Sequence, residues 1–430
     1  MMLKDNEKVQ SYLNSVCSEI RLREAHEEIR LELLCHIQEV VEEYISQGLS
    51  KDDAVNKAIA VMGDSSIVGQ QLDEVHKPKP EWSVLILSSL FVSLGLMVMY
   101  FMDRQGLSGF SLFERTLSYT ILGTVIVVGI YFFDYRKLEN YSKHIYIGAT
   151  LLLLFTFFTN PLINGNRWFI IGGISLDVVS IMPVIFVIAL AGLLNNRNWR
   201  DYKKFIHGIL LCAIPLVLIV FNGSSLVSAA IYSLACIVLL IVSGVGYRVT
   251  IFLFSAMIAI IALPIINNPY MFQRLFAFIN PHADPHGSGY LNIQLSNLID
   301  SAGFYGQGFT LEPRIIPELH TDFIFAYMTF TFGWIVAIVI VAMIVAFLVR
   351  IARIATIVKY SYAKLLVSGF IAIFSMQFLW YISMNLGLAP ITDVSLPLIS
   401  YGGSQLIINA LAVGAILSIY RRRNLSKVPN

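Results

Sequence analysis

The sequence PELHTDFIFA, residues 317–326, joins a polar stretch to a long apolar segment. The carboxylate of Asp322 therefore lies where a membrane segment begins. A carboxylate there costs free energy unless it is hydrated, paired or used, so an ionisable residue at the mouth of a membrane segment is a candidate functional residue. The alternative is a helix cap, because Thr and Asp are both favoured at helix N-termini. Spacing alone does not separate these two interpretations.

The composition of the 430-residue chain is that of a polytopic membrane protein. It is 57% hydrophobic and 13% charged, with a mean hydropathy of +0.71, whereas soluble domains carry about 25% charged residues. From Trp82 onward, apolar runs of about 18 to 25 residues recur, the length that crosses ~30 Å of hydrocarbon. We therefore predict an all-α fold with about ten membrane helices, near residues 83–102, 116–134, 144–160, 177–194, 205–222, 225–243, 247–267, 322–349, 361–385 and 395–420.

The polar sequence of residues 1–78 predicts a separate soluble helical domain. It precedes the membrane part, residues 79–430. Apolar residues at helical spacing between residues 24 and 45 predict one amphipathic helix. Ser50 is typical of a capping residue for a second helix that Gly63 ends, and a third short helix is expected from residue 65 to 74. This pattern resembles the small three-helix HAAS domain. A solvated accessory domain without chemistry is the simplest interpretation, and a cytoplasmic partner for residues 1–78 is the other.

The distribution of Lys and Arg predicts that both termini are cytoplasmic. Alternate loops are rich in Lys and Arg, as between residues 197 and 204, and the remaining loops hold single Arg residues. Such a bias marks the cytoplasmic side and supports an even number of spans. Three loops are then expected on the outer side, at residues 160–175, 268–321 and 385–395.

Two further stretches combine glycine with polar residues. The long outer loop contains GSGY at residues 287–290 and GFYGQGF at residues 303–309, and such glycines allow backbone to pass close to a ligand or another surface, or simply to turn. The last apolar segment opens with LPLISYGGSQ, residues 396–405. Irregular backbone at membrane depth is tolerated only where protein or a water-filled cavity covers it. A close-packed helix crossing is the alternative.

These stretches together resemble one family. Residues 317–326 look like the P-E-x-H-T-D-F-I-F-A signature of the SEDS family (shape, elongation, division and sporulation), which includes FtsW, RodA and SpoVE. Residues 396–404 are similar to its L-P-F-I-S-Y-G-G-S. The outer loops add weaker similarities, with Asn166, Arg167, Trp168 and Gly172 resembling R-W-I-x-x-G, and Tyr290, Gln294 and Gly306 resembling Y-x-x-x-Q and G-x-G. The resemblance extends over about residues 83–423, with the motifs in the family's order.

The resemblance implies a peptidoglycan glycosyltransferase that polymerises lipid II at the outer membrane face. It implies undecaprenyl-pyrophosphate-linked glycan as the second substrate and a class B penicillin-binding protein as partner, with no role for nucleic acid. Asp322 is then the catalytic carboxylate, as general base or as ligand to a divalent cation, Mg²⁺ or Mn²⁺. Arg167 and Arg314 are candidates for supporting the pyrophosphate. The remaining candidate substrate-binding residues are Trp168, Tyr290, Gln294, Glu318, His320, Thr321, Ser400, Tyr401, Gly402, Gly403 and Ser404.

Two departures from the family pattern leave other functions open. The acidic turn G-E-E-L-G is replaced by residues 329–333, TFTFG, and F-Q-P-S-E by residues 176–180, LDVVS, where Asp177 is the one remaining acid. These losses favour a non-catalytic scaffold or regulator of a cell-wall complex, whereas Asp322 favours an enzyme. A precursor flippase is a third hypothesis, since many spans with polar residues also suit transport. Against it, the polar signatures gather on the expected outer side.

Overall fold

The computed structural model describes residues 5–78, 80–159, 162–163, 166–171, 174–222, 226–311 and 316–425. They fall into two compact units. The first contains the described residues within 1–80, 358–360 and 419–430, and the second contains those within 81–357 and 361–418.

The first unit is a small helical domain with its own core. Its helices are α1 (Glu7–Ser18), the 3₁₀ turn η2 (Arg23–Ala25), α2 (His26–Ser46), α3 (Lys51–Met62) and α4 (Ser65–His76). The buried residues of α2 recur every four positions, as expected for one face of a helix. The Oγ of Ser50 accepts a hydrogen bond from the backbone N–H of Asp53 and Gly63 ends α3 at φ +88°, as predicted. The first helix, α1, was not predicted.

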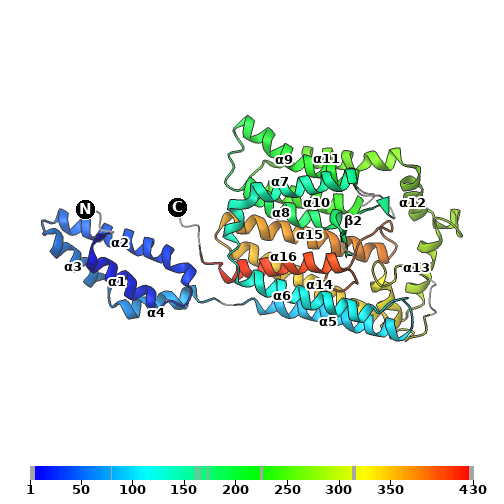
Figure 1. Ribbon diagram of the computed structural model, residues 1–430, viewed down its shortest axis with the longest axis horizontal. Helices are drawn as coiled ribbons and strands as arrows, with labels where there is room; N and C mark the ends of the chain where they lie inside the picture. Colours follow the sequence, from blue (N-terminus) through cyan, green and yellow to red (C-terminus); the bar gives the residue numbers. More distant parts are fainter. Residues whose placement is uncertain are drawn as a thin grey trace. The chain divides into compact units, whose positions relative to one another are not determined.

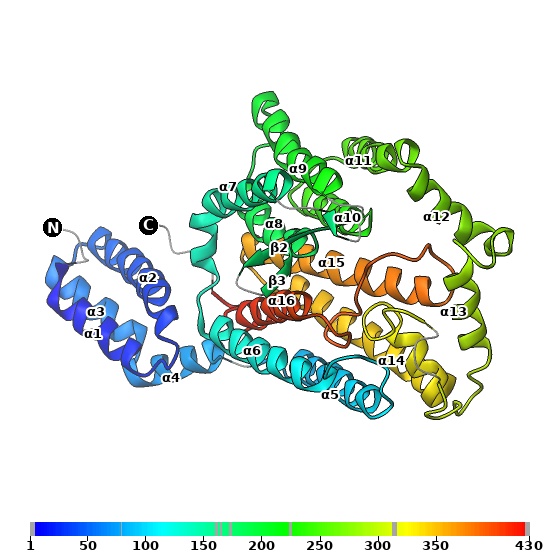
Figure 2. The same cartoon turned by 45° about the vertical axis from the view of Figure 1, so that its right-hand side comes forward.

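The second unit is an all-α bundle, which confirms the predicted fold class. Of the described helices, eight are long and apolar enough to cross a membrane, and two shorter apolar helices, α8 and α10, accompany them. Figures 1 and 2 show these helices side by side, with α12 and α13 running across one end. The helices are α5 (Trp82–Arg104), α6 (Leu112–Phe132), α7 (Arg136–Thr159), α8 (Val178–Leu194), α9 (Tyr202–Asn222), α10 (Leu226–Val242), α11 (Tyr247–Asn267), α12 (Pro269–Ile279), α13 (Tyr290–Asp300), α14 (Ile324–Ile357), α15 (Ser361–Asn385) and α16 (Gly403–Arg421), with the short 3₁₀ turn η3 (Pro281–Ala283) between α12 and α13.

Three spans differ clearly from their predicted bounds, because α14 also continues to Ile357 instead of ending near residue 349, and a small sheet was not predicted. Helix α7 begins at Arg136 because the charged residues before the apolar run continue the same helix, and α16 begins only at Gly403, so that residues 395–402 are irregular. Three short strands, β1 (Leu162–Ile163), β2 (Asn166–Ile171) and β3 (Ile174–Asp177), pair antiparallel in the order β1-β2-β3. They lie in one of the predicted outer loops.

The glycine-rich segment 303–308 docks on the backbone of α14. Helix α14 is interrupted at Gly333, whose φ of +87° is not helical. Around this break, the N–H groups of Gln307 and Gly308 donate to the carbonyls of residues 330 and 331, and those of residues 334 and 335 donate to the carbonyls of residues 303 and 304. A Cβ on Gly306 would lie 2.6 Å from the nitrogen of Gly333. These glycines therefore allow two backbones to meet. We call segment 303–308 with residues 330–335 the loop clip.

Candidate functional site

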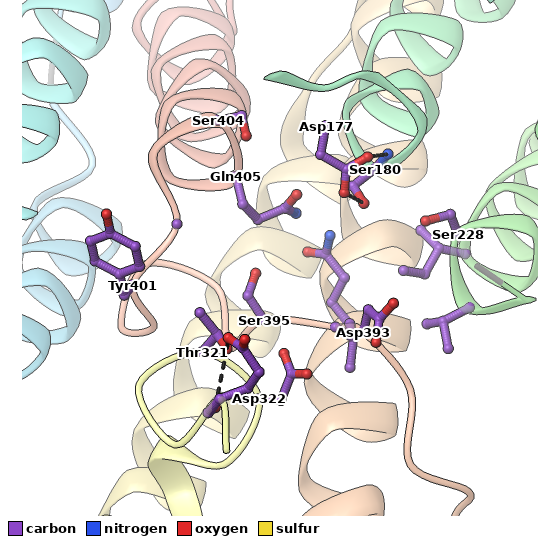
Figure 3. Close-up of a pocket in the computed structure, with 16 residues that line it drawn as sticks. Asp177, Ser180, Ser228, Thr321, Asp322, Asp393, Ser395, Tyr401, Ser404 and Gln405 are labelled. Atoms are coloured by element: carbon purple, nitrogen blue, oxygen red, sulfur yellow. Dashed lines mark hydrogen bonds between the residues drawn. The ribbon is translucent and has the colours of Figure 1, made fainter. Parts of the chain in front are cut away.

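A cavity of about 250 Å³ opens in the second unit where α8, α10, α14 and α16 begin and α15 ends. Figure 3 shows side chains from these separate elements turned towards one space. Four acidic residues are among those that line it. The lining residues are Asp177, Ser180, Val227, Ser228, Ile231, Glu318, Thr321, Asp322, Gln377, Asp393, Val394, Ser395, Tyr401, Gly402, Ser404 and Gln405.

The backbone around Asp322 is held by hydrogen bonds from the end of α15 and from the loop before α16. Asn385 Nδ2 donates to the Asp322 carbonyl at 3.0 Å, and Tyr381 Oη donates to the Thr321 carbonyl at 3.2 Å. Ser400 Oγ donates to the same Thr321 carbonyl at 2.8 Å. All three donors are buried. Residues far apart in the chain therefore fix the position of Asp322.

The structure also resolves the choice between a helix cap and a cavity residue. The first free N–H groups of α14 are bonded by α15: Ile324 N–H donates to Tyr381 Oη at 3.0 Å, and Ala326 N–H donates to Asn385 Oδ1 at 3.2 Å. These are amides that a capping carboxylate would otherwise satisfy. The side chain of Asp322 lines the cavity instead.

The electrostatics of the cavity are dominated by acids. Burial raises the pKa of Asp322 well above its usual range, and the charges of Asp393 and Glu318 raise it further. Burial also raises the pKa of Asp393, against the effect of Arg274, which lowers it. Arg274 lies on α12 and favours the ionised form of both aspartates. The cavity thus holds like charges at close quarters, an arrangement typical of functional sites.

Asp177 is a fourth acid of the cavity and the N-cap of α8. Its carboxylate accepts a hydrogen bond from Ser180 Oγ at 2.5 Å and one from Ser180 N–H at 3.3 Å. Burial raises the pKa of Asp177 although these hydrogen bonds oppose the shift. The Cα of Trp168 pairs with that of Asp177 across the sheet, so strand β2 runs beside this edge of the cavity.

A second cavity, of about 340 Å³, is lined by the turn at residues 317–320. His320 lines it and contacts the ring of Tyr401, with ring centroids 5.3 Å apart. Phe110 completes the cluster, 5.9 Å from the His320 ring. Burial lowers the pKa of His320, which favours a neutral imidazole at neutral pH. Glu318 lines both cavities and has a left-handed backbone, φ +53°.

The predicted site residues divide into three groups. Asp322, Glu318, Thr321, Tyr401, Gly402 and Ser404 line the acidic cavity, and Ser400 and His320 lie directly behind them. Three others lie elsewhere: Tyr290 and Gln294 on α13 are not among the lining residues, and Gly403 packs against the ring of Tyr119. The side chains of Arg167 and Trp168, together with Arg314 and Gly172, lie outside the described residues.

Sequence reasoning missed most of the other lining residues, and three omissions bear on the chemistry: Asp393 and Gln377, which line the cavity, and Arg274, whose charge acts on its aspartates. Asp393 lies in the expected outer loop 385–395, and a carboxylate in a polar break between two apolar segments was the available signal. Gln377 gives no such signal, because one amide inside a membrane helix is as often structural as functional. Arg274 entered only as a charge in the long outer loop.

The donor atoms of the cavity bear on the predicted cation. Among the described residues, no group of three or more His, Cys, Asp or Glu side chains is arranged to hold a metal ion. Asp322 and Asp393 nevertheless offer carboxylate oxygens, the ligand type that Mg²⁺ and Mn²⁺ prefer. Magnesium is commonly held by one or two carboxylates together with substrate phosphates. These residues therefore fit a cation shared with a pyrophosphate better than one enclosed by protein alone.

Comparison with known proteins places the fold and the motifs in one family. The chain is 30% identical over 358 residues to the probable peptidoglycan glycosyltransferase FtsW of Coxiella burnetii, covering 79% of this chain and 95% of the relative. It is 27% identical over 360 residues to stage V sporulation protein E of Bacillus subtilis, covering 80% and 98%. A chain from a structure described as a peptidoglycan synthase complex that coordinates polymerization and crosslinking superposes with a TM-score of 0.68 at 23% identity, covering 80% and 98%. The model of the cell cycle protein family FtsW/RodA/SpoVE matches residues 81–425, and the chain belongs to this family.

Proposed function

We propose that this chain is a glycosyltransferase that polymerises lipid II into glycan strands at the outer face of the cell membrane. The observation that carries the proposal is Asp322, a carboxylate of raised pKa in an acid-lined cavity where several helices end. A raised pKa makes a carboxylate a stronger base near neutral pH. The names of the family relatives, several of them peptidoglycan glycosyltransferases, agree with this reaction.

In this reaction, Asp322 takes the proton from the 4-hydroxyl of the acceptor's GlcNAc. That oxygen forms a bond to the anomeric carbon of the growing chain's MurNAc, and the bond from that carbon to undecaprenyl pyrophosphate breaks. The pyrophosphate leaves with the electron pair of the broken bond, so positive charge near it is favourable. Arg274 is the described cation that acts on Asp322 and Asp393, and we assign it this supporting role beside Arg167 and Arg314.

As the alternative to acting as the base, Asp322 would hold a divalent cation, Mg²⁺ or Mn²⁺, together with the substrate. When bound, it would supply charge for the pyrophosphate oxygens. The carboxylates would keep that charge at the mouth of the cavity, and Asn385 would keep the Asp322 backbone in place.

The proposed orientation has both termini in the cytoplasm. The Lys and Arg residues concentrate in alternate loops, and residues from both ends of the chain belong to the same compact unit. The cavity then faces outward, where a class B penicillin-binding protein would cross-link the product as partner. The first unit is free to bind a cytoplasmic partner in this orientation.

The test is polymerisation of labelled lipid II by the purified chain, with and without a candidate class B partner, comparing wild type with Asp322→Ala. Polymer from wild type and none from the variant is the expected result. Equal polymer from both would refute the role of Asp322. No polymer under any partner condition would favour a non-catalytic scaffold, and a vesicle translocation assay would then test transport.

A further inference from the structure

One buried polar atom in the cavity has no partner within the protein. Gln377 lies on α15, is 3% exposed and lines the cavity. Among the described residues, no group forms a hydrogen bond with its Oε1 atom. A buried acceptor left unpaired is costly, and more so at membrane depth. Its presence therefore points to a ligand that donates a hydrogen bond.

The acidic residues of the cavity are hydrogen-bond acceptors as well. Asp322, Asp393 and Glu318 are all hydrogen-bond acceptors when ionised, and they line the space that Gln377 faces. Figure 3 shows Asp322 and Asp393 turned into the cavity from two different loops. A pyrophosphate alone would be repelled by these charges, whereas a neutral polyhydroxyl ligand donates hydrogen bonds to all of them.

The size of the cavity limits what it holds. At about 250 Å³, it lies just below the range of about 300–1,000 Å³ that is usual for pockets that hold drug-sized ligands. It therefore suits a small ligand group such as one sugar ring. Gln377 lies eight residues before Asn385, the last residue of α15, and so about 12 Å from the end of that helix.

We propose that Gln377 and Asp393 form the subsite for the terminal amino sugar of the acceptor. Gln377 Oε1 and the Asp393 carboxylate accept hydrogen bonds from hydroxyl groups of this sugar, which directs its reactive hydroxyl to Asp322. Both are positioning residues. The inference rests on the proposed function, since it names the part of the acceptor that the acidic cavity binds.

The first test is binding without turnover. The lipid-free disaccharide-pentapeptide GlcNAc-MurNAc-pentapeptide is titrated into the full-length protein in detergent with EDTA, and the heat of binding is measured. Gln377→Leu and Asp393→Asn should each weaken binding about tenfold, the usual effect of losing one hydrogen bond. No binding by wild type, or unchanged binding by both variants, overturns the proposal. Binding that appears only when Mg²⁺ replaces EDTA also overturns it, in favour of a cation site.

A matched control is available on α16. Asn409 is 1% exposed, and within the described residues its amide atoms have no hydrogen-bond partner, but it does not line the cavity. Asn409→Leu should leave sugar binding unchanged. An equal loss in Asn409→Leu and Gln377→Leu would mean a general effect of removing a buried amide, and would overturn the proposal.

Thermal unfolding separates positioning from support of the fold. Because Gln377 Oε1 has no protein partner to lose, Gln377→Leu should unfold at the same temperature as wild type or higher. Gln377→Glu keeps an oxygen acceptor at this position and should restore sugar binding. If Gln377→Leu does not fold, the sugar affinities of Gln377→Glu and Asp393→Asn decide the question. A tenfold weaker affinity in Asp393→Asn, with wild-type affinity in Gln377→Glu, supports the proposal. Wild-type affinity in both variants overturns it.

The second test measures the half-saturating concentrations of acceptor and donor separately during polymerisation. A labelled lipid II whose 4-hydroxyl is methylated acts only as donor, and unlabelled lipid II is titrated as acceptor. Gln377→Leu should raise the half-saturating acceptor concentration about tenfold and leave that of the donor unchanged. Equal rises for both overturn the subsite. A different result is that the protein binds the sugar in a way that depends on Gln377 and yet forms no polymer under any condition. That result would refute the proposed function and support the sugar subsite.

Discussion

Replacing Gly333 with alanine should open the loop clip. Gly333 has φ +87° and ψ 171°, a region that essentially only glycine adopts, and holding another residue there costs about 1–3 kcal/mol. The added Cβ would also lie 2.5 Å from the nitrogen of Gly306, so segment 303–308 must move away. Its four backbone hydrogen bonds to α14 contribute about 1 kcal/mol each. The strain and the lost bonds together amount to about 5–7 kcal/mol.

Hydrogen exchange measured by mass spectrometry tests this reasoning. Peptides covering residues 303–308 and 330–335 should exchange at least about tenfold faster in Gly333→Ala, since about 1.4 kcal/mol already produces that factor. Gly129→Ala is the matched control, because Gly129 lies within α6 and nothing lies within 4 Å of the added Cβ. Wild-type protection of both peptides in Gly333→Ala would refute the close backbone contact.

Three further substitutions test the site. Asp322→Asn should lower the rate of polymerisation by a factor of about 10² or more and should raise the unfolding temperature at neutral pH in EDTA. The pKa of Asp322 is raised in the folded state, so the native protein binds this proton more tightly than the unfolded chain does. Wild-type stability therefore falls as the pH rises from about 4 through the folded-state pKa, and the stability of Asp322→Asn should not show this fall. Asn385→Leu leaves the N–H of Ala326 without its acceptor, which should cost about 1–3 kcal/mol in urea unfolding and lower activity as well. Gly95→Ala brings a Cβ into the carbonyl of Ile399 and should lower the unfolding temperature. Unchanged stability in Asn385→Leu would contradict the hydrogen bonds described around Asp322, and unchanged stability in Gly95→Ala would contradict the close approach of α5 to the loop before α16.

The membrane spans could be predicted because the signal is local. Apolar runs of sufficient length identify the helices whatever they pack against. The predicted bounds were wrong where a helix continues through polar residues. Helix α7 begins at Arg136, in a charged turn that hydropathy excludes from the membrane span. Conversely, the apolar residues before Gly403 are not helical, because Pro397 and the left-handed Leu398, φ +66°, interrupt them.

The site could be predicted only as far as its motifs extend. Asp322 and Tyr401 belong to recognisable stretches and reach the same cavity. Asp393 and Gln377 belong to no such stretch, and their roles depend on α15 and the following loop folding back beside the start of α14. That is a long-range property that a single sequence does not encode in any local pattern. The same holds for Gly306, which lies against the backbone of α14.

The two shortest apolar helices, α8 and α10, both border the acidic cavity. Each has 17 residues and so spans about 26 Å, less than the ~30 Å of a typical hydrocarbon layer. Most of their side chains are buried by neighbouring helices and not by lipid. The missing length therefore lies inside the bundle, where irregular backbone is tolerated because protein or a water-filled cavity covers it. The two short helices thus leave, at their N-terminal ends, space that the acidic cavity occupies.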